Sequence, residues 1–169
     1  MSSVRKVVLW LFVVNLGIAF GAGLYEARIA VPHWIRSTDA GDRWDAEAAR
    51  EANTGLRFWV YVTTGPLTLL TLASLVAAWR APLPLRTWWL AAAAFAVADR
   101  IFTFSYFIPT MVGLTGAGAA APDAADRARQ WASLNHVRHA ILLAAWLSAL
   151  RALSLLGRQP HPRAAPRAG

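Results

Sequence analysis

Four long apolar stretches, separated by polar connections, dominate the chain. They cover residues 7–25, 58–79, 88–112 and 134–156. Each approaches or exceeds the roughly 20 residues that an α-helix needs to cross a hydrocarbon core of about 30 Å. The stretches are continuous, rich in Ala and Leu, and lack a regular polar–apolar alternation, which favours helices over strands. The pattern predicts an all-α fold, an antiparallel bundle of four transmembrane helices.

The connections are too short to hold a separate soluble domain. We therefore expect one transmembrane domain over residues 1–157 and a disordered, basic cytoplasmic tail over residues 158–169. The first apolar stretch, with Arg5 and Lys6 before it, has some features of a cleaved signal peptide. Its length and the charged residues that follow it favour a retained span.

Composition agrees with this class of protein. Hydrophobic residues make up 57% of the chain and charged residues 15%, a balance that cannot give a soluble particle a properly polar surface. The chain has no cysteine, which excludes disulfides, thiolate catalysis and iron–sulfur clusters.

The net charge of +8 is distributed unevenly over the connections. Basic residues without acidic neighbours lie before the first stretch, between the second and third, and at the end of the fourth or after it: Arg5, Lys6, Arg80, Arg86, Arg151, Arg158, Arg163 and Arg167. The positive-inside rule then places both termini in the cytoplasm of an integral membrane protein, which we expect in the plasma (inner) membrane of a bacterium. Membrane lipids are the expected partners. Scattered basic residues without interleaved aromatic ones do not indicate a nucleic-acid site.

Two connections carry local signals. In the first, Asp45 is placed to cap a short helix that runs to Glu51, and Trp44 is placed to anchor that helix on the membrane surface. The second, residues 81–85, is short and contains two prolines, so the helices that it joins must be antiparallel neighbours.

The third stretch contains a charged pair, Asp99 and Arg100, near its middle. Charged groups at this depth of a bilayer are costly and mark candidate functional positions. The two side chains project about 100° apart on a helix, so each can instead bridge to a neighbouring helix and serve fold specificity alone. Arg138 in the fourth stretch is a candidate partner for Asp99 or for Glu26.

Other polar residues recur at helical spacing within the spans. They are Asn15 and Glu26 in the first; Arg57, Tyr61, Thr64, Thr68 and Thr71 in the second; Asp99, Thr103, Tyr106 and Thr110 in the third; and Asn135, Arg138 and His139 in the fourth. Because polar side chains avoid lipid, these stripes predict a polar-lined cavity in the outer half of the bundle, floored by Asp99 and open toward the outer face or the outer leaflet. Pro66 and Pro109 are placed where local unwinding would widen it, and Gly17 with Gly21 would allow a close helix contact.

A metal site is one interpretation of the histidines. His136 and His139 are three residues apart, and His33 and Glu26 are expected on the same side of the membrane. Two imidazoles at this spacing can reach one ion, but the sequence supplies no identifiable groups to orient them. We assign no metal and no other cofactor.

Short motifs carry a resemblance to a known family. They are Tyr106-Phe107-Ile108-Pro109-Thr110 and, after a loop, Trp131-Ala132-Ser133-Leu134-Asn135-His136-Val137-Arg138. Together with Gly23-Leu24-Tyr25-Glu26 they resemble the pattern of the anthrone oxygenase-like family, small four-helix membrane proteins mostly of unknown function. The resemblance spans most of the chain.

The resemblance implies oxidation of anthrones to anthraquinones by molecular oxygen, without a tightly held cofactor. It carries over Asn135 and Arg138 as site residues. The chain departs from the family in its long, charged first connection and in the presence of His136 and His139.

Residues and resemblance together give a hypothetical mechanism. An apolar aromatic substrate enters from the lipid, lies between Phe102, Tyr106 and Trp131, and loses a proton to a base. The base is His139 or Glu26, and Asn135 and Arg138 stabilise the anion that reacts with oxygen. The candidate catalytic residues are therefore Glu26, Asn135, Arg138 and His139. The candidate substrate-binding residues are Arg57, Tyr61, Asp99, Phe102, Tyr106 and Trp131.

The main alternative is a non-catalytic membrane module that binds a lipid or quinone, or that stabilises a partner complex through its Ala- and Gly-rich faces. A third possibility is a proton or solute pathway through Asp99. It would need a homo-oligomer, because the inner half of one protomer is mostly apolar.

Overall fold

The protein is mostly helical. Its structure, a computed structural model, describes residues 3–39 and 41–157. The tail predicted at residues 158–169 lies outside the described residues. In the part of the chain that is described, four helical spans are long and apolar enough to cross a membrane, which confirms the four long apolar helices expected from the sequence.

Each of the first three spans combines α-helical and π-helical segments. The first contains α1 (Ser3–Tyr25), the π-helix η1 (Glu26–Ala30) and α2 (Val31–Trp34); the second contains the π-helix η2 (Gly55–Thr64) and α4 (Gly65–Trp79); the third contains α5 (Leu85–Phe102), the π-helix η3 (Thr103–Phe107) and α6 (Ile108–Thr115). The fourth span is the single helix α7 (Ala124–Gly157). The strands β1 (Ile35–Thr38) and β2 (Gly41–Trp44), the helix α3 (Ala46–Ala52) and the 3-10 turn η4 (Ala117–Ala120) lie between the spans.

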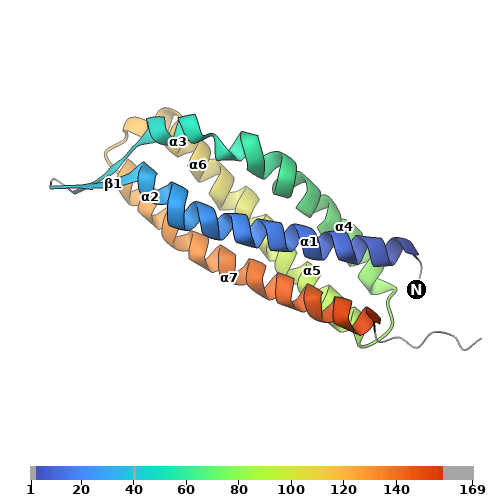
Figure 1. Cartoon of the computed structure of the whole chain (residues 1–169). Helices are drawn as coiled ribbons and strands as arrows, with labels where there is room; N and C mark the ends of the chain where they lie inside the picture. The colour runs from blue at the N-terminus through green and yellow to red at the C-terminus, as the bar shows by residue number, and fades with distance from the viewer. Residues whose placement is uncertain (1–2, 40, 158–169) are drawn as a thin grey trace, which may run out of the picture.

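Neighbouring spans run antiparallel. Along α1, Arg5 bonds to Arg80 and Asn15 to Val62, so residue numbers fall along the second span as they rise along α1. The same reversal holds for α7, because Gly17 lies against Trp146 and Gly23 against His139. In the same way α5 packs on both α4 and α7. Figure 1 shows the N-terminus, the turn between α4 and α5, and the last turns of α7 at one end of the bundle, with β1, β2 and α3 at the other, which we call the hairpin end.

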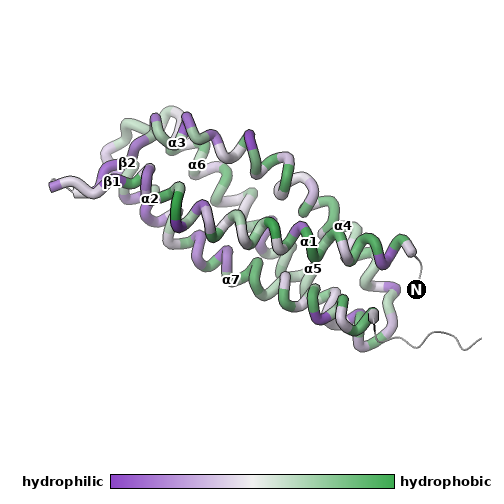
Figure 2. Tube along the Cα trace, in the orientation of Figure 1, coloured by the Kyte–Doolittle hydropathy of each residue, from purple (hydrophilic) through white to green (hydrophobic). Residues whose placement is uncertain are grey.

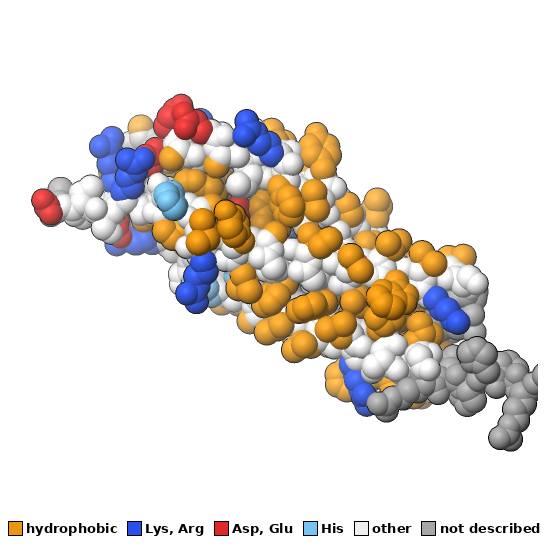
Figure 3. Space-filling view, in the orientation of Figure 1, with side chains coloured by type: hydrophobic (Ala, Val, Ile, Leu, Met, Phe, Trp, Pro, Cys, Tyr) orange, Lys and Arg blue, Asp and Glu red, His pale blue; other side chains and the backbone are white. Residues whose placement is uncertain are grey.

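Large side chains pack against alanine stripes to form the core near the N-terminal end. The large members are Leu9, Phe12, Leu16, Leu67, Leu85, Trp89 and Leu142, and the alanines include Ala92, Ala96, Ala145, Ala149 and Ala152. The flanks are also apolar, since Leu69 and Val76 are among many large hydrophobic residues that point outward. Figure 2 shows hydrophobic residues along the four spans, and the face drawn in Figure 3 has hydrophobic side chains along its middle and charged side chains mostly toward the ends, the distribution expected of a lipid-facing surface.

A small cap covers the hairpin end. The strands β1 and β2 pair antiparallel from Ile35 opposite Trp44 to Thr38 opposite Gly41, with Gly41 at a φ of 110°, a backbone conformation that glycine adopts without strain. The sequence reasoning did not predict this hairpin. The helix α3 follows it, and the backbone N–H of Ala48 donates to Asp45 Oδ1 at 3.0 Å, which confirms the predicted helix cap.

Trp44 holds the cap to the bundle. Its side chain is buried against Trp34, and its Nε1 donates to the carbonyl oxygen of Leu114 at 2.8 Å. The expectation that Trp44 anchors a helix on the membrane surface is therefore wrong, because the hairpin turns the indole toward α6. Arg50 makes a second link, with Nε donating to the carbonyl oxygen of Thr115 at 2.8 Å.

Proline residues follow all three π-helices. Pro32, Pro66 and Pro109 each stand at the second position of the α-helix that continues the span. Proline has no N–H and crowds the carbonyl four residues before it, so the preceding turn widens. At Pro66 the carbonyl oxygen in question belongs to Val62, and Asn15 Nδ2 donates to it at 2.9 Å. The local unwinding predicted near Pro66 and Pro109 is confirmed.

Candidate functional site

A cavity of about 110 Å³ lies inside the bundle at the level of the three π-helices. All four spans contribute to its wall: Ala19 and Glu26 from the first; Gly55, Trp59, Thr63 and Thr64 from the second; Arg100, Thr103, Phe107, Ile108 and Met111 from the third; and Trp131, Arg138 and Leu142 from the fourth, with Thr54 beside them. π-helical turns are rare and often mark functional sites. Here residues of all three π-helices line one cavity.

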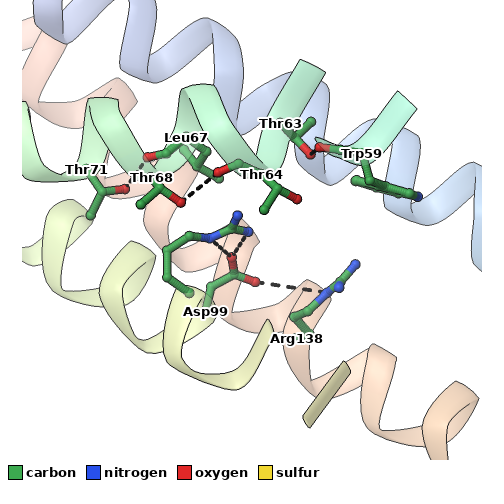
Figure 4. A network of polar contacts seen from close by, with 9 residues as sticks. Trp59, Thr63, Thr64, Leu67, Thr68, Thr71, Asp99 and Arg138 are labelled. Carbon is green, nitrogen blue, oxygen red and sulfur yellow. Dashed lines mark hydrogen bonds and ion pairs between the residues drawn. The ribbon is translucent and has the colours of Figure 1, made fainter. Parts of the chain in front are cut away.

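Asp99 and the two arginines form the charged centre of this site (Figure 4). Asp99 is fully buried. Arg100 Nε donates to Asp99 Oδ2 at 3.0 Å, and Arg100 Nη2 bonds to the same oxygen. Arg138 Nε lies 4.0 Å from the other oxygen, Oδ1. The long Arg100 side chain folds back on Asp99, so the two groups pair although their positions project about 100° apart on the helix. Asp99 also faces Arg138 on α7.

Aromatic rings hold the guanidinium group of Arg138. Its Cζ atom lies 4.8 Å from the ring centroid of Phe107 on η3 and 5.7 Å from that of Trp59 on η2. Cations are attracted to aromatic faces at these distances, more strongly where water is excluded. The two rings leave the N–H edge of the guanidinium as the part that can bind a further group.

Glu26 connects the first span to the second. Its Oε1 atom accepts hydrogen bonds from Thr54 Oγ1 at 2.7 Å and from Trp59 Nε1 at 2.9 Å, and the side chain is buried. Trp59 therefore orients both an acidic and a basic group of the cavity wall, Glu26 by hydrogen bonding and Arg138 by stacking.

Several buried polar atoms of the wall have no partner. Within the described residues, Arg100 Nη1, Arg138 Nε and Thr103 Oγ1 make no hydrogen bond. Each of these residues is at least nine-tenths buried and lines the cavity. A buried donor without a partner is costly, so such atoms are expected to meet a bound group or water.

His139 and Asn135 are buried on α7 beside this site, outside the cavity wall. The His139 ring lies against Gly23 of α1, where an added Cβ would come within 2.5 Å of Nε2. Asn135 shares a helix face with Trp131 and Arg138 and is 1% exposed. Neither the imidazole nor the Asn135 amide has a hydrogen-bond partner in the described part of the chain.

The histidines do not gather around a metal position. His136 is exposed, with its ring centroid 6.4 Å from that of His139. His33 is exposed as well, and its Nδ1 pairs with the carbonyl oxygen of Ile29 at 2.5 Å. Among the described residues, no group of three or more His, Asp or Glu side chains is placed to hold a metal ion.

Arg57 and Tyr61 do not belong to the cavity. Both are exposed, Tyr61 to 73%, so the expectation that they face the bundle interior is wrong. The expectation assumed the 3.6 residues per turn of an α-helix, whereas residues 55–64 form a π-helix with i→i+5 turns. Because each π-helical turn takes more residues, the predicted line of polar side chains rotates away from the bundle interior. Trp59 and Thr63 occupy the inward positions instead.

The predicted aromatic wall forms around a residue that the sequence reasoning did not select. The ring of Phe107 lies between those of Phe102, Tyr106 and Trp131, with centroid distances of 4.9, 5.3 and 5.7 Å. Phe107 and Trp131 line the cavity, and Phe102 and Tyr106 pack behind Phe107. The signal for Phe107 was present in the sequence, because it continues the four-residue spacing from Asp99 through Thr103.

Thr63 and Thr64 of the second span line the cavity, and Thr68 and Thr71 follow them on α4. Thr63, Thr68 and Thr71 each donate their hydroxyl to the carbonyl four residues earlier, at 2.6 to 3.1 Å (Figure 4). Such local bonds satisfy the hydroxyl groups within the helix, so these three side chains pack rather than offer free donors.

Comparison of the chain with known protein families, with curated proteins and with solved structures gave no match.

Proposed function

We propose that the protein is an integral membrane protein of the bacterial plasma membrane with both termini in the cytoplasm. The basic residues Arg5, Lys6, Arg80 and Arg86 lie at the N-terminal end of the bundle, where Arg5 bonds to the carbonyl oxygen of Arg80. The cap at the hairpin end carries acidic residues as well, including Asp42 and Glu47. The positive-inside rule supports the cytoplasmic assignment of the N-terminal end. The cavity then lies in the outer half of the membrane.

We further propose that this cavity binds an apolar aromatic molecule and oxidises it with molecular oxygen, without a cofactor, as the resemblance to anthrone oxygenase-like proteins implies. One observation carries the proposal. Donors on Arg100 and Arg138 and the carboxylate of Glu26 face a single cavity whose other walls are aromatic, aliphatic and threonine side chains. Such a site suits a flat, apolar molecule with one polar oxygen.

The proposed reaction balances without an external reductant. Glu26 takes a proton from the acidic ring carbon of an anthrone, and Arg138 stabilises the resulting oxyanion. The electron-rich carbon transfers electrons to O2 and forms a carbon–oxygen bond, giving a hydroperoxide after protonation by Glu26. Loss of water then leaves the anthraquinone, so that one anthrone and one O2 yield one quinone and one H2O.

The position of Glu26 makes it the better candidate for the base. It lines the cavity, whereas the His139 ring packs between α7 and α1 against Gly23. We assign His139 and Asn135 to the support of Arg138, which is their neighbour on α7. In this assignment Phe107 and Trp131 contact the substrate ring, and Asp99 orients both arginines.

Size limits how the substrate can sit. A cavity of about 110 Å³ is comparable with the roughly 150 Å³ engineered cavity that holds a benzene ring. One ring of an anthrone therefore fits inside, and the remaining rings must lie in the opening of the cavity.

Anthrone turnover in lipid vesicles tests the proposal. The purified protein in phosphatidylcholine vesicles should consume O2 and form anthraquinone faster than empty vesicles, which measure the spontaneous reaction. Arg138→Gln should lower the catalysed rate by about 100-fold or more, the usual effect of losing an oxyanion donor. The matched control is Arg129→Gln, two turns earlier on the same helix in an exposed ion pair, which should keep the native rate. A native protein no faster than empty vesicles, or a folded Arg138→Gln variant with full activity, contradicts the proposal.

A non-catalytic binding module is the second candidate. Its supporting observation is that Glu26 is held by two hydrogen bonds, an arrangement that suits anchoring as well as proton transfer. Saturable binding of anthraquinone, lost in Arg138→Gln, together with no catalysed anthrone oxidation, would establish this function in place of the first.

A further inference from the structure

The hairpin end of the bundle is closed by apolar packing. A second hydrophobic cluster fills the space between the cavity and the cap, with Val31, Trp34, Trp44, Ala49, Phe107, Leu114, Ala124, Ala128 and Trp131 buried in it. Hydrogen bonds from Trp44 and Arg50 to the end of α6 fix the cap in place. This packing closes a direct path to the cavity from the aqueous phase at that end.

The cavity opens through the side of the bundle, between η2 and the η3–α6 segment. The lining residues that are exposed are Gly55 on η2 and Ile108 on α6, and Thr64 and Met111 beside them are half-buried. Apart from α4, which continues the same span, η2 packs mainly against α1, and its contacts with η3 and α6 are few. We call this opening, between Gly55 and Ile108, the mouth.

Exposed hydrophobic side chains lie on both sides of the mouth. Val60 on η2 and Phe104 and Val112 on the facing segment are exposed hydrophobic side chains. Residues of this kind at the level of a transmembrane span face acyl chains. A molecule that reaches the mouth therefore comes from the lipid phase.

Several buried polar atoms at the inner end of the cavity lack hydrogen-bond partners in the described residues. In the described structure the donors are Arg100 Nη1 and Arg138 Nε, on two guanidinium groups, and the Thr103 hydroxyl. Asp99 Oδ1, 4.0 Å from Arg138 Nε, is an acceptor without a hydrogen-bond partner beside them. Charged N–H donors bind oxyanions more strongly than neutral acceptors. The gradient from an apolar mouth to buried cationic donors matches a molecule with one anionic end.

We infer that the site takes a membrane-dissolved aromatic amphiphile with an oxyanion head, a carboxylate or a phenolate. The head binds Arg100, Thr103 and Arg138, and the aromatic body occupies the mouth between η2 and η3–α6. This inference deepens the proposed function and rests on it, because it takes the same cavity as the site. It assigns Arg100 and Thr103 to ligand binding and makes the lipid, rather than water, the source of the ligand.

The head-group assignment is tested with anthracene-2-carboxylate and its uncharged methyl ester. Calorimetry in detergent micelles gives a Kd for each. Thr103→Val keeps the shape and removes a hydroxyl that makes no hydrogen bond in the described residues, so it should fold normally and raise the Kd of the carboxylate about three- to tenfold. Arg100→Gln should raise it at least tenfold, and the ester should change less than threefold in either variant.

The mouth is tested with two tryptophan substitutions on α6. Ile108→Trp fills the mouth and should raise the Kd of the acid and the ester at least tenfold. Val112→Trp, one turn further along and outside the cavity wall, should leave both unchanged. The inference is wrong if the native protein does not bind the carboxylate, if Thr103→Val and Arg100→Gln bind it normally, or if Ile108→Trp has no effect.

These results separate this inference from the proposed function. Anthrone oxidation without carboxylate binding would leave the function standing and overturn the inference. Carboxylate binding that shows the expected variant pattern, without anthrone oxidation, would do the reverse.

Discussion

Replacement of Gly23 by alanine should destabilise the protein through one contact. Gly23 lies on the face of α1 that meets α7, and a Cβ built there would lie 2.5 Å from His139 Nε2 and 3.0 Å from Cδ2. The His139 ring is buried, so it cannot swing aside without displacing its neighbours. Relief of the overlap requires α1 to move away from α7 beside Arg138.

The chain contains a matched control on the same helix. An added Cβ at Gly21 would meet nothing within 4 Å, so Gly21→Ala should gain the helix preference of alanine over glycine, about 1 kcal/mol. Gly23→Ala should lose about 1–3 kcal/mol from overpacking. Both variants gain the same helix preference, so they should differ by the overpacking cost alone, about 1–3 kcal/mol in the free energy of unfolding.

Unfolding in mixed micelles, followed by tryptophan fluorescence as SDS is added, measures this difference. A His139→Ala background should abolish the cost of Gly23→Ala, because the atom that it strikes is gone. Equal stability of Gly21→Ala and Gly23→Ala, or an unchanged cost of Gly23→Ala without the imidazole, would refute the close contact between α1 and α7.

Two further predictions concern acidic residues inside and outside the membrane. The pKa of Asp45 lies below its ordinary value, mainly because the carboxylate accepts the backbone N–H of Ala48, and Arg36 and Arg43 add to the effect. The folded state thus favours the charged form of Asp45, so the helix cap should be intact above about pH 4 and be lost as the pH falls through the lowered pKa. Hydrogen exchange of the Ala48 amide should show this loss, and Asp45→Asn should remove the pH dependence. Asp99→Asn should cost about 3–5 kcal/mol of unfolding free energy, since it leaves two buried arginines without their anion. The exposed Asp126, which pairs with Arg129, should cost less than about 1 kcal/mol when changed to Asn, and a similar loss in both variants would contradict the buried cluster.

The spans could be predicted from the sequence because hydrophobic length is a strong and local signal. Asp45 as a helix cap followed in the same way from a short-range pattern, and Asn135, Arg138 and His139 followed from one uninterrupted α-helix, α7. The hairpin of β1 and β2 was missed, since its four-residue strands carry little apolar alternation.

The second span shows where the sequence reasoning failed. Pro66 indicated unwinding, but not how many residues before it would adopt π-helical turns, and ten residues did. Over that length the altered turn places Trp59 and Thr63 inside and Tyr61 outside. The role of Trp59, which contacts Glu26 and Arg138 at once, depends on three spans meeting and has no local signature. Glycine contacts were predicted in part: Gly17 lies against Trp146, while Gly23 rather than Gly21 makes the second close approach.

A double-mutant cycle between Asp99 on α5 and Arg138 on α7 tests most directly that charged groups from separate spans share one buried site. Asp99→Asn, Arg138→Gln and the double variant, measured by unfolding in mixed micelles, should give a coupling energy of about 1–3 kcal/mol for atoms 4.0 Å apart. The exposed pair of Asp42 and Arg129, 3.0 Å apart and changed in the same way, should couple by less than about 1 kcal/mol. Additive effects of the Asp99 and Arg138 substitutions would contradict the shared site.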